Sequence, residues 1–428
     1  MKFMDKVSNV NLGSVIEINP SSLSKQYPYT EIEYIDITSV GSGFFSGSAS
    51  MPLSEAPSRA KRLVKHGDTI ISTVRPNLRS FLYIKNPNSN TVVSTGFAVL
   101  RPSNKIHSRF LYYTVTNQKF TDYLSANVKG AAYPAVDMET FARAEIWLPD
   151  MLTQHKIASI LSAYDDLIEN NLRRIKILEE MAKAIYDEWF VKFRFPGHEK
   201  VKMVESELGL IPEGWEITTI GNVVATIESG SRPKGGIDPE AKGIPSIGAE
   251  NIIGLGRYDY SKEKFVTPEF FDNMNRGHIH SGDVLLYKDG AQIGRKSMFK
   301  DGFPHIRCCI NEHVFILRTN ERCTQNYLFF WLDQPDLTQK IINLNANAAQ
   351  PGINQSGVRS LPILLPPIEM LNNVEQIMEP MLQLLFNCAK KNNILRQTRD
   401  LLLPKLISGE IDVENLDIRI GDLDEPDI

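Results

Sequence analysis

The chain contains 428 residues, of which 42% are hydrophobic, so it has enough apolar material for about two or three cores. No run of about 18 apolar residues occurs, and the first ten residues lack the apolar stretch of a signal peptide, so we expect a cytoplasmic protein without a membrane span. The net charge of −4 excludes a uniformly basic surface, but residues 409–428 carry −7, which leaves +3 on the remainder. We expect the acidic C-terminal tail, residues 412–428, to be solvated and flexible.

The first half has the pattern of short strands joined by long loops. Runs of β-branched residues at 68–74, 91–100 and 144–148 are bounded by clusters of Gly, Pro, Asn and Ser, which is typical of strands. We predict a mixed α/β (α+β) domain over residues 1–150.

A long helix is predicted to follow, within residues 151–200. Its apolar positions recur at spacings of four and three residues for more than four heptads, which is the pattern of a coiled-coil seam. A helix over residues 154–191 would be about 55 Å long, so we interpret it as a spacer. The seam consists of Ile157, Leu161, Tyr164, Ile168, Asn171, Ile175, Leu178, Ala182, Ile185 and Trp189.

The second half repeats the order of the first. The segment GAAYPAVD (residues 130–137) matches NAAQPGIN (residues 347–354) at an offset of 217. Upstream, residues 67–71 match 282–286, and residues 97–101 match 314–318. The repeat predicts a second domain of the same fold over residues 201–366.

A second long helix is predicted within residues 367–411. Two helices with such seams in one chain are expected to pair antiparallel, with Asn171 and Asn392 fixing the register; the alternative is that each packs only on its own domain. Because proline disrupts a helix interior, Pro380 and Pro404 predict a late start, a kink or an end near Leu403. The second seam consists of Val374, Met378, Met381, Leu385, Cys388, Asn392, Leu395, Arg399, Leu402 and Leu406.

Patterns that would indicate catalysis or metal binding are weak. Residues 290–297 end like a P-loop but have the wrong glycine spacing, and Asp238, Glu240 and Lys242 only faintly resemble a nuclease cluster. His278 and His280 have no further ligand at metal-site spacing. We therefore expect no catalytic residue, metal or cofactor in this chain. We expect buried thiols rather than disulfides or zinc ligands at Cys308, Cys309, Cys323 and Cys388.

Polar loops recur at matching places in the two halves, over residues 72–79 and 287–296. Arg, Lys, Asn and Gln there offer bidentate contacts to base edges, whereas hydroxyls and lysines can hold phosphates. Because the loops differ while the framework repeats, they suit the reading of two different short sequences. The candidate DNA-binding residues are Arg59, Lys61, Arg62, Ser72, Thr73, Arg75, Asn77, Arg79, Lys129, Tyr133, Ser231, Arg232, Lys234, Lys288, Gln292, Arg295, Lys296, Asn347 and Gln350.

Three segments give the chain a resemblance to a known family, the specificity subunits of type I restriction-modification systems. Residues 148–191 and 365–411 each begin with a Leu-Pro turn that leads into a long helix. Residues 207–215, ELGLIPEGW, resemble the linker that opens the second recognition domain in this family. Together with the repeat, the resemblance covers essentially the whole chain.

The resemblance implies two target recognition domains separated by an antiparallel coiled coil, each reading one half of a bipartite double-stranded DNA site. It also implies two methyltransferase subunits that carry S-adenosylmethionine and methylate adenine at N6, and restriction subunits that use ATP and Mg²⁺ to translocate and cleave DNA. The implied spacer and partner-docking residues are Ile157, Leu161, Tyr164, Ile168, Asn171, Ile175, Leu178, Ile185, Leu385, Leu395 and Leu402.

Two other functions remain open at this point. One is a non-catalytic scaffold whose coiled coil tethers two binding modules without sequence specificity. The other is an enzyme that acts alone on nucleic acid, which methylation or cleavage by the purified chain would reveal.

Overall fold

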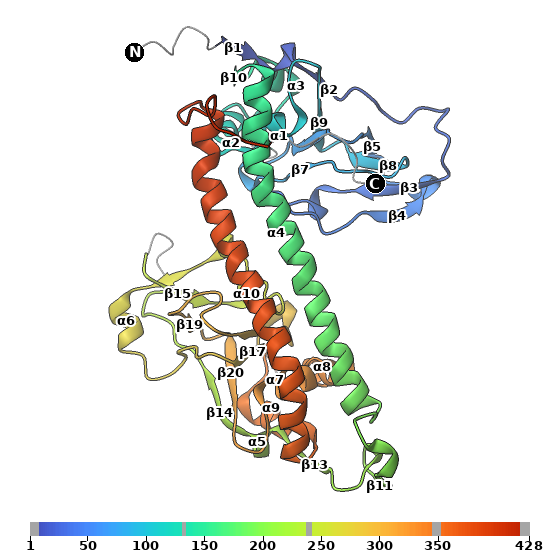
Figure 1. Cartoon of the computed structure of the whole chain (residues 1–428), viewed down its shortest axis with the longest axis vertical. Coiled ribbons are helices and arrows are strands. Elements are labelled where there is room, and N and C mark those ends of the chain that lie inside the picture. Colours follow the sequence, from blue (N-terminus) through green and yellow to red (C-terminus); the bar gives the residue numbers. More distant parts are fainter. Residues whose placement is uncertain (1–7, 131–133, 237–241, 345–351, 420–428) are drawn as a thin grey trace. The chain divides into compact units, whose positions relative to one another are not determined.

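The computed structural model describes residues 8–130, 134–236, 242–344 and 352–419 (Figure 1). The chain forms two compact units: Met1–Leu167 with Leu395–Ile428 (unit 1) and Ile168–Ile394 (unit 2). The predicted boundaries after residues 150 and 366 fall next to the starts of the two long helices, at Met151 and Ile368. The packing instead divides each helix between the two units.

Unit 1 contains two four-stranded sheets with the orders β2-β9-β6-β7 and β4-β3-β8-β5. The first is antiparallel, and the second contains one parallel pair, β3 with β8. A separate antiparallel pair joins β1 to β10, which leads into the first long helix. The elements are β1 Ser8–Asn11, β2 Ile16–Ile18, β3 Glu31–Ile35, β4 Ala49–Pro52, β5 Ala60–Leu63, β6 Thr69–Ser72, β7 Phe81–Tyr83, β8 Thr91–Ser94, β9 Phe97–Pro102, α1 Ser108–Thr116, α2 Gln118–Ala126, α3 Met138–Arg143 and β10 Glu145–Leu148.

Unit 2 repeats the four-stranded antiparallel sheet of unit 1. Its four-stranded antiparallel sheet has the order β14-β20-β17-β18, and a smaller sheet, β16-β15-β19, again contains one parallel pair. The elements are β11 Met203–Ser206, β12 Gly209–Pro212, β13 Glu216–Thr219, α5 Ile220–Val223, β14 Val224–Ser229, β15 Ile244–Ile247, β16 Phe265–Val266, α6 Pro268–Asp272, β17 Asp283–Tyr287, β18 Lys296–Phe299, β19 Cys309–Ile310, β20 Val314–Thr319, α7 Gln325–Leu332, α8 Pro335–Asn343, α9 Gln355–Ser360 and β21 Pro362–Leu365.

A buried ion pair marks the same place in both units. Arg101 donates two hydrogen bonds to Asp68, of 2.8 and 2.7 Å, and Arg318 donates two of 2.7 Å to Asp283. Asp68 and Asp283 are 0% and 2% exposed, so each pair ties the start of a central strand to its neighbour inside the core. The predicted repeat is therefore confirmed down to individual side chains.

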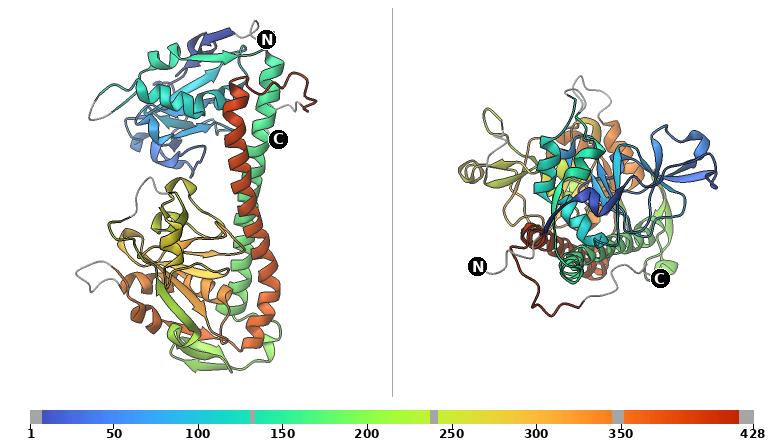
Figure 2. Two further views of the ribbon diagram at one scale, coloured as in Figure 1. Left: turned by 90° about the vertical axis from the view of Figure 1, so that its left-hand side faces the viewer. Right: turned by 90° about the horizontal axis from the view of Figure 1, so that it is seen from above.

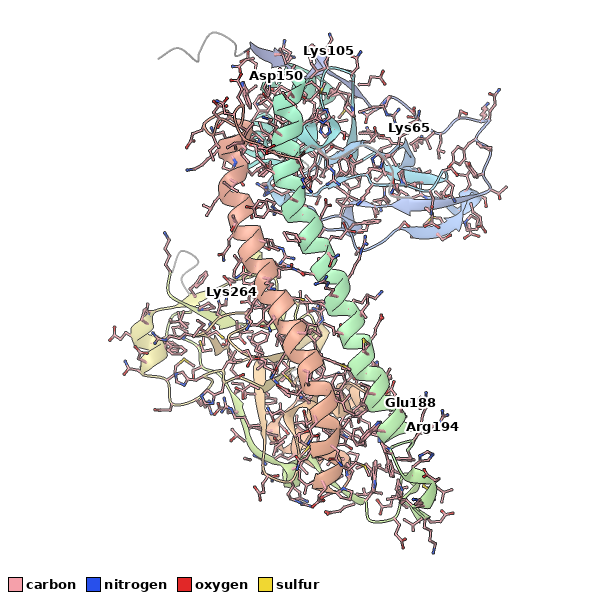
Figure 3. The ribbon with its side chains drawn as sticks, in the orientation of Figure 1. Lys65, Lys105, Asp150, Glu188, Arg194 and Lys264 are labelled. Carbon is pink, nitrogen blue, oxygen red and sulfur yellow. The ribbon has the colours of Figure 1, made fainter. Side chains whose placement is uncertain are left out.

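The first long helix, α4, covers Met151–Tyr186. It begins after Asp150, whose carboxylate accepts a 3.0 Å hydrogen bond from Thr153 N, as an N-cap does. This bond lowers the pKa of Asp150. A π-helical turn over Asp187–Val191 extends the helix, and Glu188 there lies within ion-pair distance of Arg194 (Figure 3).

The second long helix, α10, covers Ile368–Ile407 and lies antiparallel to α4 in each unit (Figures 1 and 2). In unit 1 Asp165 pairs with Arg399, and in unit 2 Asn171 bonds to Asn392. None of the predicted seam residues is exposed. The predicted pairing of the helices is confirmed.

The expectation that α10 would start late or end near Leu403 is wrong. The helix runs through Pro380 and Pro404 and ends at Ile407. Because proline has no N–H, the carbonyl one turn before each proline lacks its helical hydrogen bond. Both prolines are exposed, so water can reach that side of the helix and hydrogen-bond to the carbonyl.

Six of residues 412–419 are exposed, as expected for a solvated tail, but the segment is anchored to unit 1 at Val413. Val413 is 1% exposed within the core of unit 1. The Nζ atom of Lys156 donates to the carbonyls of Glu414 and Leu416, at 2.7 and 2.9 Å, and Gly409 lies against the Trp147 ring. Apolar side chains among the acidic residues thus fasten the chain end to unit 1, because burying them removes apolar surface from water.

All four cysteines are buried free thiols, as predicted, and burial raises the pKa of Cys309 to about 11. Across the part of the chain that the structure describes, no helix combines the length and apolar character needed to cross a membrane.

Candidate nucleic-acid interface

The candidate loop of unit 1, residues 72–79, is held by backbone hydrogen bonds on two sides. Thr73 N donates to Gly96 O at 2.8 Å, and Arg75 N donates to Pro134 O at 3.0 Å. Val136 N donates back to Thr73 O. The loop therefore lies beside the repeated segment that contains residues 134–137.

The corresponding loop of unit 2, residues 287–296, has the same neighbours. Ile353 N donates to Lys288 O at 2.9 Å, and Asp289 forms a β-bridge with Gly352. In each unit the structure thus places the candidate loop beside part of the repeated segment, residues 134–136 or 352–353, which lies more than 50 residues away in the sequence.

Arg75 and Asn77 are exposed at the tip of the loop in unit 1. Among the described residues, neither side chain has a hydrogen bond or ion pair. Arg75 has left-handed backbone angles, φ 48° and ψ 61°, where it precedes a short 3-10 turn over Pro76–Leu78. A non-glycine residue in this conformation is strained, and such residues cluster at binding sites.

Arg79 is also left-handed, with φ 56°, but its side chain is tied to the fold. Its guanidinium donates to Thr116 O at 2.9 Å and to the Gln118 side chain, and lies 5.5 Å from the centre of the Phe81 ring. Burial lowers the pKa of this guanidinium. Arg79 thus acts as a positioning residue that anchors the loop to α1 and α2.

Three other candidates in unit 1 are turned inward. Ser72 and Thr73 are 4% and 7% exposed and donate to the carbonyls of Val74 and Gly96. Arg62 donates to Asn19 and to the carbonyl of Phe97, and burial lowers its pKa. We exclude these three side chains from the DNA-contacting surface because their polar atoms already have partners within the fold.

Arg59, Lys61 and Lys129 are exposed. Arg59 donates to Asp36 at 2.7 Å, and Lys129 pairs with Asp137, which raises the pKa of the lysine. Both pairs face solvent, so exchange for a phosphate partner costs little. Lys61 has no side-chain partner among the described residues.

In unit 2, Gln292 and Arg295 are exposed without a side-chain partner in the described part of the chain. Lys296, in contrast, is 8% exposed and donates to Thr338 at 2.7 Å, with Asp333 at 3.3 Å. Burial lowers the pKa of Lys296. Its partners in and beside α8 make it a structural lysine, and we exclude it from the surface.

A chain of polar contacts links Arg232 to the second loop. Arg232 lies 3.5 Å from Glu312, and His313 lies 3.5 Å from Glu312 and 2.8 Å from Asp289. Asp289 in turn pairs with Lys288 at 2.9 Å. These contacts connect the candidate segment 231–234 to the loop 287–296. In that segment Ser231 is half-buried and Lys234 is exposed.

The exposed surface near the loops also contains apolar side chains that the sequence pattern does not single out. Leu78, at the loop tip, is 63% exposed, and Phe44 is 62% exposed. The search for polar loops named mainly polar side chains, although apolar side chains can also contact the methyl group of thymine.

Three of the predicted DNA-binding residues and two residues of the weak nuclease pattern lie outside the described residues: Tyr133, Asn347, Gln350, Asp238 and Glu240.

Within the described ranges, no cluster of three or more His, Cys, Asp or Glu could hold a metal ion. His278 Nε2 instead lies 2.9 Å from the carbonyl oxygen of Phe271.

The predicted spacer and partner-docking residues are buried or half-buried, and they pack within the two units. Other apolar side chains of the helices face solvent. These outer residues are Leu167, Leu172, Ile177 and Met181 on α4, and Ile377, Leu384, Ile394 and Leu401 on α10, and each is at least 38% exposed.

Comparison with known proteins gives one consistent family. Residues 4–180 and 212–396 match the type I restriction modification DNA specificity domain. The chain is 28% identical over 355 residues to the MjaIX specificity subunit of Methanocaldococcus jannaschii, covering 81% of this chain and 78% of that protein. It is 23% identical over 451 residues to the HindI specificity subunit of Haemophilus influenzae, covering 90% and 95%.

The crystal structure of the type I restriction-modification S subunit from M. genitalium has a similar fold. It aligns with a TM-score of 0.56 at 16% identity, covering 95% of this chain and 98% of that one. The two family matches fall on the two repeats, and together they span most of the sequence. The chain therefore belongs to the family of type I restriction-modification DNA specificity proteins, and its role is DNA sequence specificity.

Proposed function

We propose that this chain is a non-catalytic specificity subunit that reads a bipartite DNA target, one half with each unit. The observation that carries the proposal is the pair of equivalent loops built on one framework. Asp68–Arg101 and Asp283–Arg318 anchor the preceding strands in the same way, whereas the exposed side chains differ, Arg75 and Asn77 in one loop and Gln292 and Arg295 in the other.

The chemistry of these side chains supports base reading. Arginine makes a bidentate contact with guanine, and asparagine or glutamine with adenine, through the major groove. Lys61, Lys129 and Lys234 are exposed cations of the kind that hold phosphates and set the register without reading sequence. Two such loops in one chain suit a target with two different halves.

We further propose that methyltransferase subunits dock on the outer residues of α4 and α10. Exposed apolar groups on long helices favour association with another apolar surface. In the complex, two such subunits carrying S-adenosylmethionine would methylate adenine at N6, and restriction subunits would use ATP and Mg²⁺ to translocate and cleave DNA. Because its substrate would be cellular DNA, we place the complex in the cytoplasm.

The test is adenine methylation across the genome of a methylation-free host that expresses the neighbouring methyltransferase with and without this chain. We expect methylation at one bipartite motif, lost when the chain is omitted. Methylation that is absent, or unchanged without the chain, would support a scaffold without sequence specificity. A chain carrying Arg75→Ala and Asn77→Ala should alter only one half of the motif.

A further inference from the structure

Two polar layers interrupt the apolar contact between α4 and α10. In unit 1, Arg399 pairs with Asp165, which also accepts a 2.6 Å hydrogen bond from the Tyr113 hydroxyl. In unit 2, Asn171 Nδ2 donates to Asn392 Oδ1 at 2.9 Å, and Asn392 Nδ2 donates to Ile168 O at 3.3 Å. The two asparagines are 8% and 1% exposed, so their amides depend on each other for hydrogen bonds.

The internal repeat gives each polar layer an apolar counterpart. At the offset of 217, Asp165 corresponds to Leu382 and Arg399 to Ala182, and both counterparts are fully buried in unit 2. Likewise Asn171 corresponds to Cys388 and Asn392 to Ile175, which are 3% and 1% exposed. The two helices are thus alike in shape but not in the polarity of these layers.

The polar layers are therefore matched when α4 pairs with α10, but not when either helix pairs with the same helix of a second copy. If α4 paired antiparallel with α4 of a second copy of this chain, each Asp165 would face Ala182 and each Asn171 would face Ile175. If α10 paired with a second α10, each Arg399 would face Leu382 and each Asn392 would face Cys388. Every polar group would then lose its partner on the facing helix, which disfavours the pairing strongly for the buried asparagines and less strongly for the part-buried Asp165 and Arg399.

We propose that the Asp165–Arg399 and Asn171–Asn392 layers make the seam selective, so that α4 accepts α10 and rejects the like helix of a second copy. A single polar seam residue is known to fix register and oligomeric state in coiled coils. Here two layers of different chemistry act on one helix pair, and the remaining seam positions are free to be apolar. The inference concerns the helices alone and does not depend on the proposed function.

The test compares three forms of the full-length chain by light scattering after size exclusion, over a wide range of concentration. The first is the unaltered chain. The second carries Asp165→Leu, Arg399→Ala, Asn171→Cys and Asn392→Ile, which copies each apolar counterpart into its polar layer and makes like helices compatible. The third form, Asp165→Arg with Arg399→Asp, reverses the ion pair. In this form α4 and α10 still offer each other opposite charges, whereas two like helices still leave each charge without a partner. Circular dichroism establishes that each form is folded.

We expect the unaltered and reversed forms to stay monomeric and the fourfold variant to dimerise, with self-association strengthened about 100-fold or more. A folded fourfold variant that stays monomeric would overturn the proposal. Equal dimerisation of the reversed form would also overturn it, since that would indicate general disruption of the seam. The milder variant Asn171→Cys with Asn392→Ile keeps the test decisive if the fourfold change prevents folding, and it should dimerise to a smaller extent.

Discussion

The loops at residues 72–79 and 287–296 share a backbone path but use different residues to follow it. Arg75 and Arg79 have φ angles of 48° and 56°, and the residues 215 positions later, Gly290 and Gly294, have φ angles of 71° and 88°. Glycine adopts this conformation without strain, whereas for arginine it costs roughly 1 kcal/mol. Arg79 recovers stability through its bond to Thr116 O. The Arg75 backbone is held by the bond from its N–H to Pro134 O, and its side chain has no partner among the described residues, as the proposed contact with DNA requires.

The largest effect is expected from breaking the framework beneath these loops. Arg101→Ala leaves Asp68 as a buried carboxylate without its cation, which should lower the free energy of unfolding by about 3–5 kcal/mol. Arg318→Ala should do the same for Asp283. Urea unfolding followed by circular dichroism measures both. Replacing Asp68 and Arg101 together by alanine should recover part of the loss; a double variant that is no more stable than Arg101→Ala would contradict this account.

Arg75→Gly should separate binding from stability. Loss of one bidentate base contact costs about 1–3 kcal/mol, so affinity for a duplex carrying the mapped motif should fall by roughly 5- to 150-fold in the assembled complex. The free energy of unfolding should stay unchanged or rise by up to about 1 kcal/mol as the strain is removed. Arg143→Ala, an exposed arginine of α3 paired with Glu139, is the matched control and should change neither quantity appreciably. A less stable Arg75→Gly protein would mean that Arg75 supports the fold.

Gly294→Ala tests the glycine that occupies, in the loop 287–296, the position of Arg79 in the loop 72–79. The new Cβ would be strained at φ 88° and would lie 3.4 Å from Cγ1 of Ile342, so we expect a loss of about 1 kcal/mol in unfolding free energy. Gln292→Ala in the same loop is the control, with full stability and weaker binding. Thermal unfolding of the two variants distinguishes them, and equal melting temperatures would argue against the backbone explanation.

The smallest effect should come from Lys129→Ala. Its pair with Asp137 is fully exposed to solvent, so the stability of the chain should not change measurably. If Lys129 holds a phosphate, the slope of log affinity against log salt should decrease by about 1, equally for target and unrelated DNA. A loss of affinity confined to the target would instead assign Lys129 to base reading.

The sequence was most informative where its signal is local or periodic. The 4-3 spacing identified the seam, and the offset of 217 identified two domains of one fold. The partners of single side chains were not predictable, because Arg62 meets Asn19 and Lys296 meets Thr338, each more than 40 residues away. The contact of Val413 with the core of unit 1 was not predicted. The many acidic residues of 409–428 indicated a solvated tail, and the apolar residues Ile411, Val413 and Leu416 among them were not considered.

The fastening of residues 409–419 to unit 1 has a consequence for synthesis. Unit 2 is one continuous stretch, Ile168–Ile394, whereas unit 1 combines a segment before it with a segment after it, Met1–Leu167 and Leu395–Ile428. On a ribosome that adds about 5–20 residues per second, the first unit would wait from roughly ten seconds to a minute for the segment that contains Leu406 and Val413. The unit that is translated first is therefore completed after unit 2, when the segment containing Leu406 and Val413 joins its core.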